Sequence, residues 1–586
     1  MGKHERSITI EPISPGASRS RSARPHPQAA NPASAARAKV SRSRLALMGG
    51  IFAVVFAVIS GRLISVSAFP TVTVRPAPVL VSEKMPRPDI VDRNGRILAK
   101  DLGTASLFAD ARKIIDVDEA VELLSDVLGD VPRKTLRRKL MSRRAFVWLK
   151  RGMRPREQLA VHRLGLPGLG FKHENRRVYP NGQVAAHILG AVDLDNHGIA
   201  GIERYLDKVR KSSDTLAKSL APLTLSVDLR AQFAVREELT AAMETFKAKA
   251  AAAVVLDVHT GEVLAMTSLP DFDPNQPAQA LRKDAINRMT AGLYEMGSVF
   301  KAITVAMALD EGVATLESRY DARQPIRYAS FKISDFHAKR RILTLPEVFI
   351  YSSNVGAAKM ALSVGKKRQK AFLKRLGLLD RLRTELPESR QPQYPKTWRP
   401  LNVMTISFGH GLSVAPLQLA SAAAALVNGG KLITPTFLRR SEAAAFVMAK
   451  QVLNPETSKK LRYLMRLNVT DGSGKKADVP GYRIGGKTGT AEKATKRGYS
   501  KNRLLTSFLS TFPTDNPRFV VLVMLDEPKG SKATHGYATA GWNAAPVTGR
   551  IIRRIAPLLG VLPESGQRMR VFEEQPVLVG YKKELR

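Results

Sequence analysis

Apolar residues form one long block near the start of the chain, residues 45–69 (LALMGGIFAVVFAVISGRLISVSAF). A helix needs roughly 20 such residues to cross the hydrocarbon core of a bilayer, so this block predicts a transmembrane anchor. Arg62 lies near one end of the block, where its side chain can reach the lipid headgroups or contact another membrane helix.

Residues 1–44, which come before this block, are rich in proline, serine and basic residues and contain little apolar sequence. Such a segment buries too little apolar surface to offset the entropy of the chain, so we expect a disordered tail. Its positive charges predict a cytoplasmic N-terminus and place everything after Phe69 outside the cytoplasm. A cleaved signal peptide is the alternative, but such peptides usually start closer to the N-terminus.

The next region, residues 70–225, is expected to form an extracytoplasmic domain, which we call the pedestal. Asn94-Gly95, a strong hairpin signal, lies between the apolar pairs 90–91 and 97–98. Residues 117–163 have helical periodicity and a dense run of Arg and Lys, which we interpret as a solvated helix face. The aromatic residues of this stretch do not interleave with the basic ones in a way that suggests a nucleic-acid platform.

Two pairs of apolar strands, each joined by a turn, mark the two ends of residues 226–565. The pairs are 251–257 with 263–266, and 508–512 with 519–524. Helical segments such as 299–309 and 416–427 lie between them, so the pattern predicts an antiparallel sheet flanked by helices. The predicted fold class is α+β and multidomain: a single transmembrane helix, the pedestal, and this second domain. Residues 566–586 form a polar tail to which we assign no structure.

Composition sets three limits on this picture. The 586 residues are too many for one ordinary core, which agrees with two or more folded units. The formal net charge of +42 suggests an anionic partner, whether a membrane surface, an anionic polymer or nucleic acid, without choosing among them. The chain has no cysteine, which excludes disulfides, thiolate metal sites and a cysteine nucleophile.

The first candidate for chemistry is the stretch 298–301 (SVFK). Ser298 opens an apolar helix, and the N-terminus of a helix stabilises an oxyanion. Lys301 follows at i+3, so both side chains lie on one helix face. Burial or a neighbouring cation lowers the pKa of a lysine, which would allow Lys301 to take the Ser298 proton. The alternative is a capping serine followed by an ordinary surface lysine.

The second candidate is the stretch 352–354 (SSN), which follows an apolar segment. A hydroxyl and an amide two residues apart can point into one cleft. Ser352 could relay a proton toward a leaving amine, and Asn354 could hold a substrate amide. A polar loop or a helix cap would have the same sequence.

The third candidate is the stretch 487–490 (KTGT). Lys487 supplies a second cation, which could lower the pKa of Lys301. Thr488 and Thr490 offer hydroxyls to a carboxylate, and Gly489 lets a substrate backbone approach the strand edge. A glycine-rich hairpin is the alternative when this stretch is taken alone.

The order of the three stretches favours one active site over three chance matches. They are separated by 54 residues (352 − 298) and 135 residues (487 − 352), and each falls in its expected context of helix start, inter-helix loop or strand. The backbone N–H groups of Ser298 and Thr490 could then form an oxyanion hole. The combination indicates acyl transfer through a serine ester.

Other catalytic signatures do not occur in the sequence. There is no H-E-x-x-H or His-rich cluster for zinc, no G-x-x-x-x-G-K-[ST] loop for phosphates, and no G-x-S-x-G elbow around Ser298. We therefore expect neither a metal nor a cofactor.

With these motifs, residues 45–565 resemble the class B penicillin-binding proteins, especially the cell-division transpeptidases of the FtsI type. S-x-x-K, S-D-N and K-T-G are a signature set of penicillin-binding proteins and class A β-lactamases, and Ser353 stands here at the position of the Asp. Further similar stretches are 87–95, 177–180, 185–190 and 198–203 in the pedestal, and 287–288, 408–411 and 428–430 beyond it. Pro88 stands where the first pedestal motif has Gly. The pedestal leaves no room for the glycosyltransferase domain of class A members.

The resemblance implies a dimerisation-type pedestal followed by a transpeptidase domain with a β-lactamase-like fold. It implies that Ser298 attacks the D-Ala-D-Ala carbonyl of a peptidoglycan stem peptide, releases D-alanine and forms an acyl-enzyme. An amine from a neighbouring stem then completes the cross-link, and β-lactams inhibit by acylating Ser298. By the same resemblance, the catalytic residues are Ser298, Lys301, Ser352, Asn354 and Lys487, and substrate is bound by Thr488, Gly489 and Thr490.

The resemblance also implies a location and partners. The protein would be a single-pass protein of the bacterial inner membrane, anchored through residues 45–69, with a cytoplasmic N-terminus and a periplasmic catalytic domain. It would act at the division site with an FtsW-type glycosyltransferase and other division membrane proteins, and not with nucleic acid.

Four alternatives stay open at this point. An elongation-specific class B transpeptidase is the nearest. A D,D-carboxypeptidase or β-lactam hydrolase would use water in place of the amine, but there is no obvious deacylating Glu motif. A β-lactam sensor usually has further membrane spans. A basic nucleic-acid-binding protein would bind with a steep salt dependence.

Overall fold

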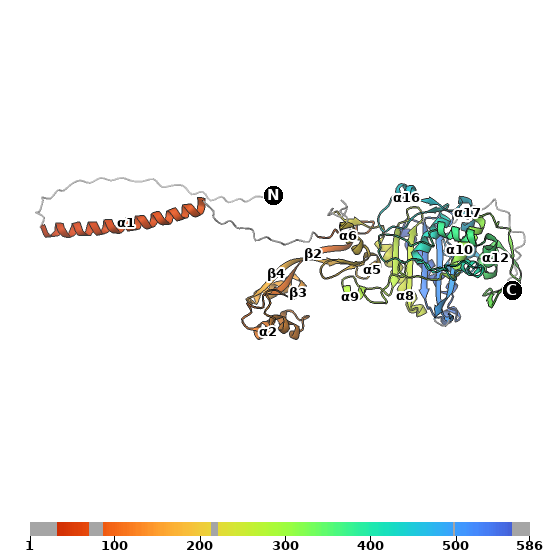
Figure 1. Cartoon of the computed structure of the whole chain (residues 1–586), viewed down its shortest axis with the longest axis horizontal. Coiled ribbons are helices and arrows are strands. Elements are labelled where there is room, and N and C mark those ends of the chain that lie inside the picture. The colour runs from red at the N-terminus through yellow and green to blue at the C-terminus, as the bar shows by residue number, and fades with distance from the viewer. Residues whose placement is uncertain (1–31, 69–85, 212–220, 496–497, 565–586) are drawn as a thin grey trace, which may run out of the picture. The chain divides into compact units, whose positions relative to one another are not determined.

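The computed structural model describes residues 32–68, 86–211, 221–495 and 498–564 (Figure 1). The chain divides into two compact units, Met1–Met85 and Pro86–Arg586, each described here by itself. Residues 1–31 of the expected N-terminal tail, and the expected C-terminal tail 566–586, lie outside the described residues.

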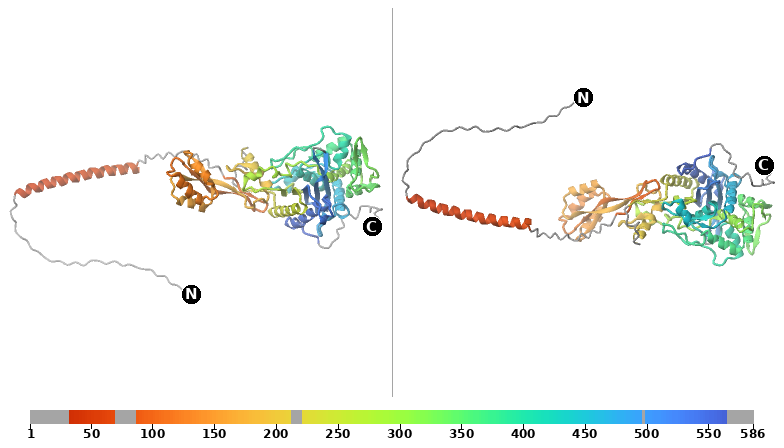
Figure 2. Two further views of the ribbon diagram at one scale, coloured as in Figure 1. Left: turned by 90° about the horizontal axis from the view of Figure 1, so that it is seen from below. Right: turned by 90° about the horizontal axis from the view of Figure 1, so that it is seen from above.

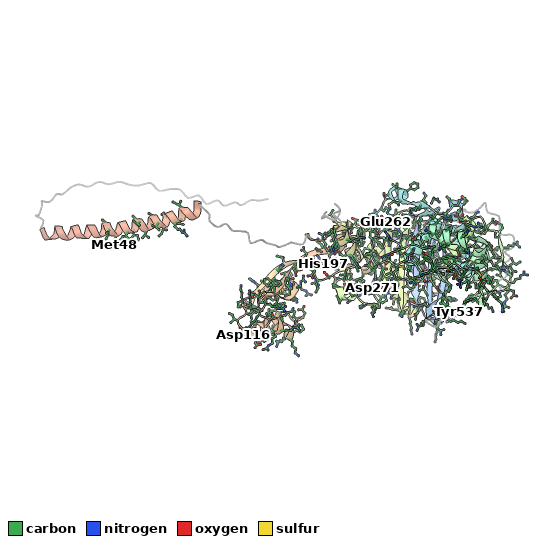
Figure 3. All side chains as sticks on the ribbon, in the orientation of Figure 1. Met48, Asp116, His197, Glu262, Asp271 and Tyr537 are labelled. Atoms are coloured by element: carbon green, nitrogen blue, oxygen red, sulfur yellow. The ribbon has the colours of Figure 1, made fainter. Side chains whose placement is uncertain are left out.

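In the first unit, the described residues form the helix α1 (Pro32–Ala68). Its segment Ala46–Ile64 has a mean hydropathy of 2.1 and is long and apolar enough to cross a membrane. Apolar side chains such as that of Met48 are exposed along it (Figure 3). The disorder expected over residues 1–44 is not found over 32–44, which are helical. Pro32 occupies the first helical position, where proline fits, and the Ala, Arg and Lys residues after it are good helix formers.

The pedestal begins the second unit and consists of a twisted sheet with short helices. Its elements are β1 (Ile90–Val91), β2 (Ile97–Ala109), α2 (Val117–Val127), α3 (Arg133–Leu140), β3 (Val147–Met153), α4 (Pro155–Arg163), β4 (Leu169–Val178), α5 (Ala186–Leu189), β5 (Ala191–Val192), β6 (Gly198–Ala200), α6 (Gly201–Lys211) and β7 (Leu223–Thr224). The long strand β2 pairs antiparallel with β1, β3 and β4, and β1 pairs in parallel with β7. Helices α2, α3 and α4 pack their apolar residues against β2 and β3.

The helices predicted within residues 117–163 are found as α2, α3 and α4. The prediction is wrong for Val147–Met153, which form the strand β3. In β3 only Leu149 and Met153 are buried, and the strand is held by its pairing with β2. A short apolar run does not distinguish strand from helix by itself. Asp116, before this stretch, caps α2 by accepting hydrogen bonds from two backbone N–H groups (Figure 3). The basic residues of α3 are mostly exposed, as predicted.

The predicted hairpin at Asn94-Gly95 is confirmed. Asp92 stabilises it by accepting hydrogen bonds from the backbone N–H groups of Asn94 and Arg96, both at 2.8 Å. Asn94 also donates through Nδ2 to Asp228 Oδ2 at 3.0 Å. The turn therefore ties the base of the pedestal to the start of the following domain.

Three of the pedestal stretches singled out in the sequence meet at one buried carboxylate, that of Glu203. Arg87 Nε donates to Glu203 Oε2 at 2.8 Å, and Arg177 Nε donates to Glu203 Oε1 at 2.7 Å. Tyr179 donates its hydroxyl to the same Oε1 at 3.2 Å. Pro88 fits this arrangement, because only its carbonyl is used, as the acceptor of an Arg177 N–H at 3.0 Å.

The second domain is built on a five-stranded antiparallel sheet in the order β16-β17-β18-β8-β9. The strands are β16 (Gly485–Thr495), β17 (Gly498–Phe512), β18 (Phe519–Asp526), β8 (Ala250–Asp257) and β9 (Val263–Leu269). Both predicted strand pairs occur, β8 with β9 and β17 with β18. Strands from the two ends of the domain meet in the middle of the sheet, where β18 pairs with β8.

Alternate residues of the central strands enter two separate cores. Val255 and Val523 pack with α8 (Leu229–Phe246) and α18 (Ala544–Leu558) on one face. Val254 and Leu522 pack on the other face with α10 (Phe300–Asp310) and α15 (Pro416–Val427). The period-2 alternation buries both faces of the sheet, and Figure 2 shows helices on both sides of it. The α+β fold class predicted for this domain is thus observed.

The remaining elements surround this framework. They are α9 (Pro277–Ala280), η1 (Gly297–Val299), β10 (Arg319–Asp321), β11 (Ile326–Tyr328), β12 (Phe331–Ile333), β13 (Ile342–Thr344), α11 (Leu345–Ile350), α12 (Asn354–Val364), α13 (Lys366–Arg375), α14 (Pro400–Ser407), β14 (Lys431–Leu432), α16 (Glu442–Met448), β15 (Lys450–Gln451), α17 (Pro455–Thr470), η2 (Lys475–Ala477), η3 (Lys532–Thr534) and η4 (Ala540–Trp542). Of these, η1, α11, α12 and the loop between β12 and β13 form one side of the candidate site, and the edge strand β16 forms the other.

Candidate active site

Ser298 lies in the short turn η1, immediately before α10. The preceding Gly297 has φ +58, a left-handed conformation that favours glycine. A Cβ at Gly297 would also lie 2.8 Å from the carbonyl oxygen of Thr490. The turn that carries the serine is therefore packed directly against strand β16.

Lys301 lies one turn after Ser298, and its side-chain nitrogen has four oxygen neighbours. Nζ is 2.9 Å from Ser298 Oγ, 2.6 Å from Ser352 O, 3.1 Å from Ser352 Oγ and 2.7 Å from Asn354 Oδ1. The Ser352 carbonyl and the Asn354 amide oxygen can only accept hydrogen bonds, so they occupy two N–H groups. In a neutral amine the lone pair then remains for the Ser298 hydroxyl.

Burial controls the charge of Lys301. The residue is 1% exposed, and the loss of solvent lowers the pKa of its ammonium well below the usual value. The positive charge of Lys487 lowers this pKa further, whereas the carboxylate of Asp335 raises it. The lowering effects dominate, so a far larger fraction of Lys301 than of a solvated lysine is the neutral amine, the form that can take a proton.

Ser352 and Asn354 lie where α11 ends and α12 begins. Ser352 has φ +58, which is uncommon for a residue with a side chain, and the conformation directs both its carbonyl and its hydroxyl to Lys301. Ser353 caps α12 by accepting from Gly356 N–H at 2.9 Å. Asn354 is the first helical residue, and its Nδ2 donates to Ser334 O at 3.0 Å, which leaves Oδ1 facing Lys301.

Lys487 is buried in strand β16, on the opposite side of Ser352 from Lys301. Its Nζ donates to Ser352 Oγ at 3.0 Å and to Thr488 O at 3.3 Å, and it lies 5.7 Å from the centre of the Phe349 ring. Burial lowers the pKa of Lys487 to about 7. This lysine therefore changes its charge near neutral pH.

Thr488 and Thr490 make contacts away from the two lysines. Thr488 Oγ1 is 2.6 Å from Ser473 Oγ, and Thr490 Oγ1 accepts from Ala540 N–H at 3.1 Å. These contacts fix the two hydroxyls along the edge strand. Within the described residues, no group of three or more acidic or histidine side chains is placed to hold a metal ion.

Gly489 lies where strand β16 packs closely against residues 296–299, so a larger residue would not fit. A Cβ at this position would lie 2.6 Å from Val299 Cγ2 and 2.7 Å from Met296 O. The sequence suggested that this glycine admits a substrate backbone. The structure adds a second reason for glycine, since the turn that carries Ser298 fills the space beside it.

Two family models match the chain, and both matches agree with this architecture. The penicillin binding protein transpeptidase domain matches residues 251–553, and the penicillin-binding protein dimerisation domain matches residues 82–219. The chain is 45% identical over 486 residues to the probable peptidoglycan D,D-transpeptidase FtsI of Caulobacter vibrioides, covering 81% of this chain and 82% of the relative. The chain belongs to the class B penicillin-binding proteins of the FtsI type.

Two more distant relatives have similar coverage. The probable peptidoglycan D,D-transpeptidase PenA of Neisseria meningitidis is 34% identical over 506 residues, which is 81% of this chain and 85% of the relative. The peptidoglycan D,D-transpeptidase FtsI of Escherichia coli is 31% identical over 505 residues, which is 81% of this chain and 84% of the relative. All of the candidate residues fall within the matched transpeptidase domain.

In this penicillin-binding protein, the three motifs form one hydrogen-bonded group. Contacts of 3.1 Å or less join the side chains of Ser298, Lys301, Ser352, Asn354 and Lys487 into a chain of donors and acceptors. The contacts of Thr488 and Thr490 lie beside this group and outside it. The sequence indicated which residues these are, but not that one hydroxyl, that of Ser352, joins the two lysines.

The sequence did not indicate two carboxylates beside the site of this penicillin-binding protein. Asp335 Oδ2 accepts from Ser353 Oγ at 2.7 Å, and Asp335 lies in a loop 18 residues before Ser353 in the chain. Glu295 Oε1 accepts from Gly411 N–H at 2.8 Å and from the Tyr499 hydroxyl at 3.0 Å. Glu295 lies just before Ser298 in the chain, whereas Asp335 comes from a separate loop that only the folded chain brings to the second motif.

Proposed function

We propose that this chain is a peptidoglycan D,D-transpeptidase that works through an acyl-enzyme on Ser298. The observation that carries the proposal is the buried Lys301 Nζ, 2.9 Å from Ser298 Oγ. Its two pure acceptors, Ser352 O and Asn354 Oδ1, leave the amine lone pair for the serine proton. The relatives named as D,D-transpeptidases supply the substrate class.

In the first half-reaction, Lys301 takes the Ser298 proton as Oγ attacks the penultimate D-alanine carbonyl of a stem peptide. The backbone N–H groups of Ser298 and Thr490 receive the developing oxyanion. The carbon–nitrogen bond to the terminal D-alanine then breaks. The proton reaches the leaving nitrogen through Ser352 Oγ, which lies between Lys301 and Lys487.

Substrate positions follow from the groups left for binding. Lys487, Thr488 and Thr490 would hold the terminal carboxylate of the stem, and Asn354 would hold an amide of the donor. Binding of a carboxylate favours the protonated form of Lys487, whose pKa is about 7 in the free protein. The substrate itself would thus place a positive charge beside Ser352.

In the second half-reaction, an amine from a neighbouring stem attacks the ester carbonyl. The new amide forms and the Ser298 ester bond breaks. The proton that the amine loses passes through Ser352 Oγ to Lys301, which returns it to Ser298 Oγ. A β-lactam would acylate Ser298 in the same way as the donor, with opening of its ring. The leaving nitrogen then stays attached, which hinders attack by the amine.

The location and partners are part of the same proposal. The segment Ala46–Ile64 would anchor the chain in the inner membrane, with the basic N-terminus in the cytoplasm and the catalytic domain in the periplasm. The FtsI-type relatives support a role in septal synthesis beside an FtsW-type glycosyltransferase and other division membrane proteins. Depletion should produce filaments, whereas an elongation enzyme would give rounded cells.

The direct test is covalent labelling of the detergent-solubilised chain with a fluorescent penicillin. Three proteins are compared: the unchanged chain, Ser298→Ala, and Ser363→Ala, a matched change at an exposed serine of α12. We expect stable label on the unchanged chain and on Ser363→Ala, and none on Ser298→Ala. Label that persists in Ser298→Ala would refute the assignment of the nucleophile. Turnover of the label within seconds would favour a hydrolase.

A further inference from the structure

The turn at Ser352 needs support from outside its own motif. Its φ of +58 is disfavoured for a residue with a side chain, and such a conformation persists only where the surroundings hold it. Both oxygens that Ser352 presents to Lys301 depend on this conformation. A feature that holds the turn therefore also sets the environment of Lys301.

The carboxylate of Asp335 makes the contacts that hold the turn. Oδ2 accepts from the Ser353 hydroxyl at 2.7 Å, and Oδ1 accepts from Val355 N–H at 2.9 Å. Ser353 Oγ accepts in turn from Gly356 N–H at 2.9 Å. The carboxylate and this hydroxyl together bind the first turn of α12, where a negative charge is favourable.

The residue beside Asp335 orients the amide of the second motif. Ser334 O accepts from Asn354 Nδ2 at 3.0 Å, so Oδ1 of the same amide faces Lys301 Nζ at 2.7 Å. Two adjacent residues of the loop between β12 and β13, Ser334 and Asp335, therefore hydrogen-bond to the 352–354 turn and the start of α12. The contacts of Asp335 itself, to Ser353 Oγ and Val355 N–H, use no atom assigned to the reaction.

We propose that Asp335 is a positioning residue of the acylation site, which holds the 352–354 turn so that Ser352 and Asn354 meet Lys301. The proposal rests on the proposed function, because it assigns Asp335 a part in the reaction of Ser298. Asp335 acts through Ser353 and Val355 and does not touch the serine itself. The carboxylate is also a negative charge close to Lys301.

Because Asp335 is charged, its removal should shift the pH dependence of acylation, which the loss of a purely structural contact would not do. Asp335 raises the pKa of Lys301, and the opposing charge is that of Lys487 on β16. His410, from the loop after α14, also faces Lys301, and burial lowers its own pKa, so it is mostly neutral. Removal of the Asp335 charge lowers the pKa of Lys301 further. The lysine then stays unprotonated to lower pH, and the acid limb of acylation moves to lower pH.

The test measures the second-order rate of penicillin labelling of the full chain in detergent across a pH series. The variants are Asp335→Asn and Asp335→Ala, with Asp321→Asn as the control. Asp321 lies on β10, and within the described residues its carboxylate pairs with Arg323, at 2.9 Å, and not with the three motifs. We expect Asp335→Ala to be slower by on the order of 100-fold, as for a small misplacement of catalytic groups.

Asp335→Asn keeps the shape and one acceptor oxygen, so its rate should fall less, but its acid limb should move to lower pH. Asp321→Asn should match the unchanged chain in rate and in pH profile. Equal rates and an unmoved acid limb in folded Asp335→Asn would overturn the proposal, even if Asp335→Ala does not fold. Failure of the unchanged chain to label at Ser298 would instead refute the proposed function.

Discussion

Lys301 and Lys487 approach one hydroxyl from opposite sides, with their Nζ atoms 3.1 and 3.0 Å from Ser352 Oγ. Both lysines are buried, which lowers the pKa of each, and the positive charge of Lys487 lowers the pKa of Lys301 further. The Ser352 hydroxyl contacts both amines, and in the proposed mechanism it would pass a proton between them. This relationship underlies the first two predictions.

The first prediction concerns Lys301 as the base. Lys301→Ala and Lys301→Arg should each lower the rate of penicillin acylation by about 10²–10⁴-fold, because the alanine has no base and a guanidinium does not deprotonate. Lys366→Ala, a change at an exposed lysine of α13, should leave the rate unchanged. Time-resolved labelling measures all three. A Lys301→Arg variant as fast as the unchanged chain would show that no base is needed at this position.

The second prediction is a pH shift caused by Lys487. Its positive charge lowers the pKa of Lys301, so removal of the charge in Lys487→Met lets the Lys301 pKa rise. The free base then forms only at higher pH, and the acid limb of acylation should move to higher pH. The maximal rate should also fall, since the carboxylate of the donor loses its cation. The direction is opposite to that expected for Asp335→Asn, which makes the two variants controls for each other.

The third prediction tests the packing at Gly489. Gly489→Ala places a methyl group 2.6 Å from Val299 Cγ2, so the turn that carries Ser298 must shift. We expect a lower melting temperature and penicillin labelling slower by about 10-fold or more. Gly103→Ala, on β2 of the pedestal, meets nothing within 4 Å and should change neither. Normal labelling by Gly489→Ala would show that the turn can accommodate the methyl group without moving Ser298.

The fourth prediction concerns the stability of the pedestal. Glu203→Gln removes the anion shared by the buried guanidinium groups of Arg87 and Arg177, which keep Asp207 and Asp101 as partners. The change should lower the free energy of unfolding by about 3 kcal/mol. Tyr179→Phe removes only one hydrogen bond to the same carboxylate and should cost about 1 kcal/mol. Denaturant unfolding of the full chain in detergent separates the two values. Equal effects would show that the carboxylate is not the centre of this network.

Much of the fold was predictable because its signals are local. The apolar block at 45–69, the turn at Asn94-Gly95 and the alternating strands of the second domain follow from residue type and period. The wrong predictions fell where local signals are ambiguous or overridden. Residues 147–153 became a strand through pairing with β2, and residues 32–44 continued a helix that the proline and basic composition did not suggest.

The sequence by itself determined the candidate catalytic residues, since Ser298, Lys301, Ser352, Asn354 and Lys487 fall in three recognisable spacings. Only the tertiary structure decided what surrounds them. It buries both lysines, which lowers their pKa values, and it brings Asp335 to the second motif from a separate loop. Burial and long-range hydrogen bonds depend on how distant segments pack, so no pattern along the chain could have fixed them.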